Sequence, residues 1–104
     1  MKELKSFQKK YLKALAHDLK PVVFLGQNGA TTNFIESVDQ ALEKHELIKI
    51  KFIDYKEKEF KNQISETIVN ETKAFFVSII GHTLILYRKS SNEKNQKIKI
   101  PQNE

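Results

Sequence analysis

Apolar residues recur with two different periods along the chain, and each change of period marks a new element. Between residues 4 and 16 they recur every three or four positions, which is typical of an amphipathic helix. This stripe consists of Leu4, Phe7, Tyr11, Leu12 and Leu15. The helix is predicted to end before Lys20, because Pro21 favours extended backbone in the residue ahead of it.

A strand, a helix and a second strand are predicted next. The continuous apolar run over residues 22–25 is typical of a strand covered on both faces. Thr31 or Thr32 can cap the helix that follows. The inward face of that helix is Phe34, Ile35, Val38, Ala41 and Leu42. Residues 47–53 alternate with period two, which predicts a strand parallel to the first, as in a βαβ unit.

The rest of the chain predicts a third helix and a β-hairpin. Asp54 and Glu57 have the spacing of a capping box. The helix behind them is predicted to face inward with Phe60, Ile64, Ile68 and Val69. Two apolar runs, 75–80 and 83–88, are joined by Gly81 and His82 and predict the hairpin. The polar segment at about 90–97 is expected to be mobile, and residues 98–101 can add a short edge strand.

Composition and length favour one globular domain that covers residues 1–104. The 104 residues are 39% hydrophobic and 30% charged, a balance typical of a folded domain with its own core. There is no cysteine, so disulfides and thiolate metal sites are excluded. The apolar runs are too short to span a membrane and the start has no signal-peptide pattern, so we expect a cytoplasmic protein without membrane contacts.

Positive charge is concentrated at the two ends of the chain. The net charge is +5, and residues 1–20 carry six lysines against Glu3 and Asp18. Residues 81–104 carry five basic residues against Glu93 and Glu104, whereas the middle of the chain is acidic on balance. This distribution favours a basic patch built from both ends and a polyanionic partner. The alternative is that these lysines only keep the protein in solution.

Gly26, Gln27, Asn28 and Gly29 form a loop between the first strand and the second helix. Such a junction gathers backbone N–H groups at the positive end of a helix dipole, an arrangement suited to a phosphate. The two glycines also let a ligand approach the backbone closely. A tight turn without any ligand is the alternative, and the motif alone favours it. The glycine spacings of dinucleotide-binding folds and P-loops are absent.

The residues do not favour catalysis. His17, His45 and His82 lie far apart in sequence and lack metal-ligand spacing. The serines have no nucleophile-elbow motif around them, and thiol nucleophiles are absent. We therefore expect a protein that is not an enzyme and that uses no cofactor, metal or small-molecule substrate.

Several segments in a fixed order resemble one known family. They are residues 12–17, 19–23, 26–29, 40–43, 45–51, 80–81 and 83–88. In these segments the chain resembles the CRM domain, the chloroplast RNA splicing and ribosome maturation module, in its stand-alone bacterial YhbY-like form. The resemblance runs from about residue 4 to residue 101. It implies an α/β fold of order α-β-α-β-α-β-β with a mixed four-stranded sheet, similar to the C-terminal domain of translation initiation factor three.

The resemblance also implies a function and a site. Family members bind RNA, and the bacterial form is associated with precursors of the large ribosomal subunit. Their G-x-x-G loop is the RNA contact, by analogy with the loop of KH modules. Carried over, the predicted RNA-binding residues are Gly26, Gln27, Asn28 and Gly29 with Lys20, Lys49, Lys51, Arg88, Lys89, Lys9, Lys10 and Lys13. The chain departs from the family at His82, where a basic residue is common, and at Ala14, where a glycine is common.

Two alternatives from other classes stay open at this point. The protein can be an interaction module that docks on a ribosomal protein through its sheet or its first helix. It can also be an enzyme acting on a phosphorylated small molecule, which would require a closed pocket at the loop with an acid or a histidine facing it.

Overall fold

The computed structural model describes residues 3–54 and 57–103. These residues form the helices α1 (Ser6–Ala16), α2 (Thr32–His45) and α3 (Lys58–Thr72), the strands β1 (Val23–Leu25), β2 (Leu47–Phe52), β3 (Phe75–Ile80) and β4 (Thr83–Tyr87), and the short 3-10 helix η1 (Glu93–Asn95). The predicted α-β-α-β-α-β-β order and the α/β class are confirmed.

The four strands form one mixed sheet in the order β1-β2-β4-β3. β1 runs parallel to β2, and Leu25 pairs with Phe52, whereas β4 pairs antiparallel with both β2 and β3. Gly81 has a positive φ of 59°, which closes the turn between β3 and β4. The parallel pair and the hairpin are as the sequence predicts.

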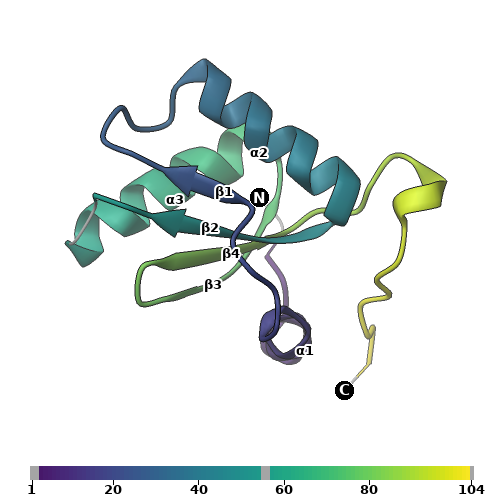
Figure 1. The fold of residues 1–104 in the computed structure, drawn as a ribbon. Coiled ribbons are helices and arrows are strands. Elements are labelled where there is room, and N and C mark those ends of the chain that lie inside the picture. Colours follow the sequence, from purple (N-terminus) through teal and green to yellow (C-terminus); the bar gives the residue numbers. More distant parts are fainter. Residues whose placement is uncertain (1–2, 55–56, 104) are drawn as a thin grey trace.

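Helices cover both faces of the sheet, but unequally. In Figure 1, α2 and α3 lie on one face and α1 lies alone on the other. The larger core cluster joins α2 and α3 to the sheet through residues such as Val38, Ile68 and Ile50. The smaller cluster joins Leu12 and Ala16 of α1 to β2, β3 and β4. The face that carries α1 is therefore only partly covered.

The prediction that residues 22–25 are covered on both faces is wrong. Val23 and Leu25 are buried, but Val22 and Phe24 are 48% and 54% exposed. β1 is an edge strand, and the main contacts of α1 are with the other three strands, so the described helices leave this side of β1 largely open. The phenylalanine ring is left open to a partner.

The inward face of α1 also differs from the prediction. Leu12 and Ala16 are fully buried, whereas Tyr11 and Leu15 are 40% and 42% exposed. One helix on an open sheet face buries only a narrow stripe, so the outer members of the predicted apolar stripe stay in solvent.

In α3 an aromatic and a charged residue exchange their expected places. Phe60, which was predicted to face inward, is 54% exposed, whereas Lys61 is 8% exposed. The Lys61 ammonium donates to the Gly81 carbonyl at 2.8 Å, so the buried charge has a partner. α3 begins after Glu57, whose side chain makes no capping bond, so the predicted capping box is not formed.

The C-terminal segment is held by one buried carboxylate. Glu46 ends α2 with a positive φ of 65°, and its side chain is fully buried. Its carboxylate accepts hydrogen bonds from the N–H groups of Ser90, Lys97 and Ile98 at 2.8, 2.7 and 3.2 Å. Residues 98–101 form no strand; Ile98 packs instead against the cluster under α1. The segment expected to be mobile thus has fixed partners in the structure.

Candidate nucleic-acid interface

The loop at residues 26–29 is a tight turn at one end of the sheet. The Gly29 N–H donates to the Gly26 carbonyl at 3.2 Å, and the Thr31 N–H donates to the Gly29 carbonyl at 2.9 Å. Gly29 has a φ of 73°, a conformation that side chains with a Cβ disfavour. At Gly26 an added Cβ would meet no atom within 4 Å, so this glycine leaves open space for a ligand.

The loop leads directly into a capped helix. Thr31 is the N-cap of α2, and its hydroxyl accepts a hydrogen bond from the Phe34 N–H at 3.1 Å, as predicted. Within residues 3–54 and 57–103, the backbone N–H groups of Gln27, Asn28, Thr32 and Asn33 have no acceptor. The loop and the helix N-terminus thus offer several free donors at the positive end of the dipole. An anion such as a phosphate can satisfy them.

A groove of about 670 Å³ runs along this junction. Besides the loop residues, it is lined by Phe24 on β1, Asn33 on α2 and Asp54, which follows β2. Among the described residues that line it, Asp54 is the only carboxylate. The groove is therefore rich in amides and backbone donors, and an aromatic residue lies at its side.

Three of the predicted lysines lie on or next to the first two strands. Lys51 is exposed and is the register partner of Phe24, so the two residues share one face of the sheet. Lys49 lies on the same face, but its ammonium donates to the carbonyls of His17 and Leu19 at 3.2 and 3.0 Å. Lys20 is exposed ahead of β1. Lys51 is therefore the predicted cation that the strand pairing brings beside the loop.

The lysines of α1 divide into two groups. Lys9 is half-buried, with its ammonium 5.7 Å from the centre of the Phe76 ring. Lys10 and Lys13 are exposed, and Lys13 and His17 line a hollow of about 330 Å³ over β4 together with Lys49. Lys10 and Lys13 are free to meet a polyanion, whereas Lys9 already has a partner.

Arg88 and Lys89 lie at the opposite end of the sheet from the loop. Tyr87, which precedes them, pairs with Leu47 at the start of β2, whereas the loop lies beyond the end of β1. Figure 1 shows this separation: the loop and the hairpin turn lie on the left, and the C-terminal segment lies on the right. The structure does not bring these two basic residues to the loop.

The guanidinium of Arg88 is occupied within the fold. It donates to the Asp39 carboxylate, to the Thr72 carbonyl at 2.8 Å and to Glu43 at 3.4 Å. The Ser91 hydroxyl and N–H also donate to Glu43, and these bonds, assisted by Arg88, hold the pKa of the Glu43 carboxyl below its ordinary value. This network ties α2 to α3 and to the C-terminal segment.

His82 lies at the same end of the sheet as the loop. Its carbonyl accepts from the Phe52 N–H at 2.8 Å, and the Ile53 N–H donates to the Leu25 carbonyl at 2.9 Å, so the hairpin turn and the loop are linked through the end of β2. The Lys61 ammonium lies 3.3 Å from the His82 Nδ1. Sequence reasoning missed this lysine, because its neighbour Phe60 is the residue expected inside.

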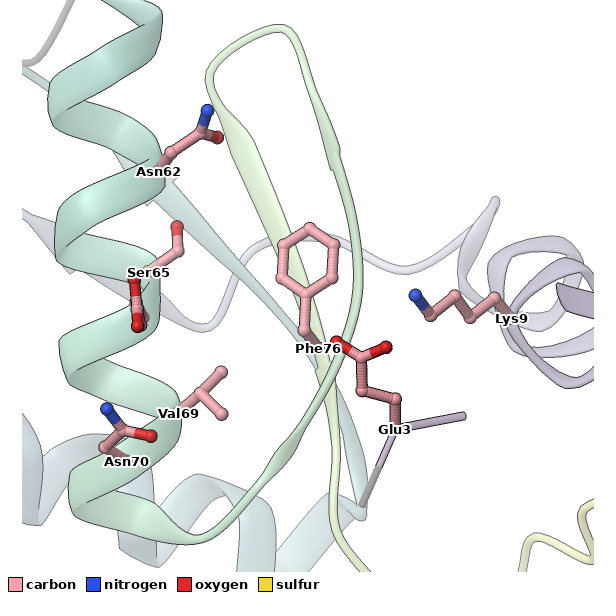
Figure 2. Close-up of a pocket in the computed structure, with 8 residues that line it drawn as sticks. Glu3, Lys9, Asn62, Ser65, Val69, Asn70 and Phe76 are labelled. Carbon is pink, nitrogen blue, oxygen red and sulfur yellow. The ribbon is translucent and has the colours of Figure 1, made fainter. Parts of the chain in front are cut away.

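A second cavity lies between α3 and β3. Figure 2 shows Asn62, Ser65, Val69 and Asn70 along α3, with Phe76 facing them and Glu3 and Lys9 opposite. The cavity measures about 600 Å³. Two of its lining residues, Glu3 and Glu66, are acidic and one, Lys9, is basic. The described lining of each cavity carries one negative charge on balance, so charge does not separate them. The groove at the loop is preferred because it has the free backbone donors at the start of α2.

The described part of the chain contains no cluster of three histidine or carboxylate side chains that could hold a metal ion. Among its helices, none is long and apolar enough to cross a bilayer.

Comparisons with known proteins match the chain to one family. A model of the CRS1 / YhbY (CRM) domain matches residues 4–88. A Haemophilus influenzae protein named RNA-binding protein is 48% identical over 96 residues, which cover 92% of this chain and 96% of the relative. The Bacillus subtilis protein named Probable RNA-binding protein YqeI is 35% identical over 94 residues, which cover 90% of this chain and 95% of the relative.

A solved structure has the same fold. The solution structure of SAV1595 from Staphylococcus aureus, described as a candidate RNA-binding protein, matches with a TM-score of 0.80 and 34% sequence identity. The match covers 94% of this chain and 99% of that one.

Proposed function

The chain belongs to the CRS1/YhbY (CRM) domain family, and we propose that it binds ribosomal RNA during assembly of the large ribosomal subunit, without catalysing a reaction. Relatives named as RNA-binding proteins match it over nearly their whole length, which supports RNA as the partner. A role on ribosomal precursors would place the protein in the cytoplasm, where bacterial ribosomes assemble.

One observation carries the choice of site. The loop at residues 26–29 and the first turn of α2 offer backbone N–H groups that have no acceptor among the described residues. In this proposal a phosphate of the RNA backbone accepts from these groups, and Lys51 beside them adds a cation. The side-chain amides of Gln27 and Asn28 can contact base edges and supply selectivity.

The proposal is tested by placing negative charge in the loop. We expect the double variant Gln27→Asp with Asn28→Asp to lower RNA affinity roughly tenfold or more, because two carboxylates would face phosphate. Both side chains are exposed and both glycines remain, so the fold should survive. Binding is measured by fluorescence anisotropy with labelled fragments of large-subunit RNA, and folding by thermal unfolding.

A matched control separates the loop from the overall charge. Asn62→Asp with Gln63→Asp makes the same change of charge at exposed positions on α3. This control should keep most of the affinity. If both pairs lower binding equally, or if the loop pair binds like the unchanged protein, the loop is only a turn and the proposed site is wrong.

Docking on a ribosomal protein is a second candidate function. It is favoured by the exposed apolar residues of α1 and the segment behind it, since Tyr11, Leu15 and Leu19 are each 40–42% exposed. Association with ribosomal particles that survives nuclease treatment and is lost in Leu15→Ser would support docking. Association that nuclease abolishes would support RNA binding instead.

A further inference from the structure

Phe24 is an exposed aromatic residue in the middle of a strand. Its neighbours Val23 and Leu25 are buried in the core beneath α2, so the alternation of the strand directs the Phe24 ring to the opposite face. On that face α1 packs against β2, β3 and β4. The ring is consequently 54% exposed.

The surroundings of this ring carry the groups that a nucleotide needs. Phe24 lines the same groove as the loop at residues 26–29, two residues ahead of Gly26. Lys51 is its register partner on the neighbouring strand and is exposed on the same face. Amide side chains of Gln27, Asn28 and Asn33 line the groove as well. An aromatic face, a cation, amides and free backbone donors thus lie within one short stretch of surface.

We propose that the RNA bound here is single-stranded and that one unpaired base stacks on the ring of Phe24. The phosphate of the stacked nucleotide or of its neighbour is then held by the N–H groups of the loop and by Lys51. In a duplex both faces of each base are covered by adjacent base pairs, so a protein ring cannot stack on them. This inference rests on the proposed function and names the class of RNA that the site takes.

The positive charge beside Phe24 favours a nucleic acid over an apolar peptide as the occupant. An apolar partner would leave the Lys51 ammonium and the N–H groups of Gln27 and Asn28 without partners at the interface, which is costly. A nucleotide satisfies all of them, because its phosphate accepts hydrogen bonds and its base has an apolar face.

The first experiment compares two substitutions of equally exposed phenylalanines. Phe24→Ala removes the proposed stack, whereas Phe60→Ala removes a ring that is also 54% exposed but lies on α3. Anisotropy is measured with a labelled single-stranded RNA and with a blunt-ended duplex of two separate strands of the same base composition. Because Phe24→Ala removes one base–aromatic stack, it should weaken single-strand binding roughly 5- to 150-fold. It should leave duplex binding unchanged, and Phe60→Ala should change neither.

The second experiment detects the stack directly. The chain contains no tryptophan, so Phe24→Trp introduces a single tryptophan, whose ring can itself stack on a base. Its emission should be quenched on addition of single-stranded RNA and remain unchanged with the duplex, and Phe60→Trp should respond to neither. Phe24→Trp should also retain the affinity that Phe24→Ala loses.

The outcomes separate this inference from the function on which it rests. If the unchanged protein binds single-stranded RNA and duplex equally, or if Phe24→Ala binds single strands as the unchanged protein does, the stacking proposal is overturned and RNA binding stands. An unquenched Phe24→Trp that still binds the single strand would overturn it as well. If the unchanged protein binds neither form of RNA, both the stacking proposal and the proposed function are overturned.

Discussion

Arg88 is predicted from the sequence to bind RNA, but its side chain already has hydrogen-bond partners within the fold. Its side chain is 17% exposed and contacts the carboxylates of Asp39 and Glu43 and the carbonyl of Thr72. The planar guanidinium presents five donors in a rigid fork, so it reaches several oxygens at once. A phosphate would have to displace these partners, so we assign Arg88 to holding α2, α3 and the C-terminal segment together.

This assignment predicts the effect of removing the guanidinium. Arg88→Gln should lower the free energy of unfolding by about 1–2 kcal/mol, because the charged hydrogen bonds of the guanidinium are lost. The loss is no larger because the carboxylates of Asp39 and Glu43 are partly exposed to solvent. RNA affinity should change less than about twofold. Chemical denaturation and anisotropy measure the two quantities. As a control, Lys89→Gln removes the same charge from the exposed neighbouring residue and should leave stability unchanged. A large loss of RNA affinity in Arg88→Gln would show that Arg88 contacts RNA after all.

At the scale of elements, local signals were sufficient for most of the fold. The cap at Thr31, the period-two pattern of β2 and the Gly81-His82 turn each depend on a few neighbouring residues, and each is present as predicted. These features also place the loop at residues 26–29 at the end of the sheet. The part of the site that local chemistry specifies was therefore predictable from the sequence.

Features that depend on distant neighbours were not predictable. The run over residues 22–25 is apolar throughout, and nothing within it indicates that β1 lies at an edge where α1 does not reach Phe24. Lys61 is buried because the turn at Gly81, far along the chain, offers its carbonyl. In both cases the tertiary partner decides which side of the element is covered, and sequence periodicity carries no information on that partner.

Lys10 and Lys13, which are exposed on α1, should each contribute to RNA binding. The double variant Lys10→Gln with Lys13→Gln should preserve α1, because glutamine is a good helix former. It should lower affinity for single-stranded RNA roughly fivefold per lysine at about 0.1 M salt, since each phosphate contact contributes about 0.7 to the salt slope. Lys44→Gln with Lys94→Gln removes the same charge near η1, at the other end of the sheet from the loop. Equal losses from the two pairs would mean that only net charge matters and that α1 has no special part.

At the scale of the whole molecule, the fold brings together the two ends of the chain, which are far apart in the sequence. The two basic ends of the chain lie side by side, because the Gln8 side chain donates to the Pro101 carbonyl at 3.1 Å and Ile98 and Ile100 pack under α1. Figure 1 shows the C-terminal segment descending toward α1, on the side of the sheet away from α2. The charged helix and the uncovered part of β1 therefore share one face, so one RNA strand can meet both.

This arrangement predicts how RNA affinity depends on salt. If Lys10, Lys13, Lys20 and Lys51 each neutralise one phosphate of a single strand, log affinity should fall against log salt with a slope of about 3, from about 0.7 per contact. Each single substitution of these lysines by glutamine should lower the slope by about 0.7. Phe24→Ala should lower affinity at every salt concentration and leave the slope unchanged, because stacking releases no counterions. A titration from about 0.05 to 0.5 M salt measures both quantities; a flat dependence in the unchanged protein would rule out phosphate neutralisation as the source of affinity.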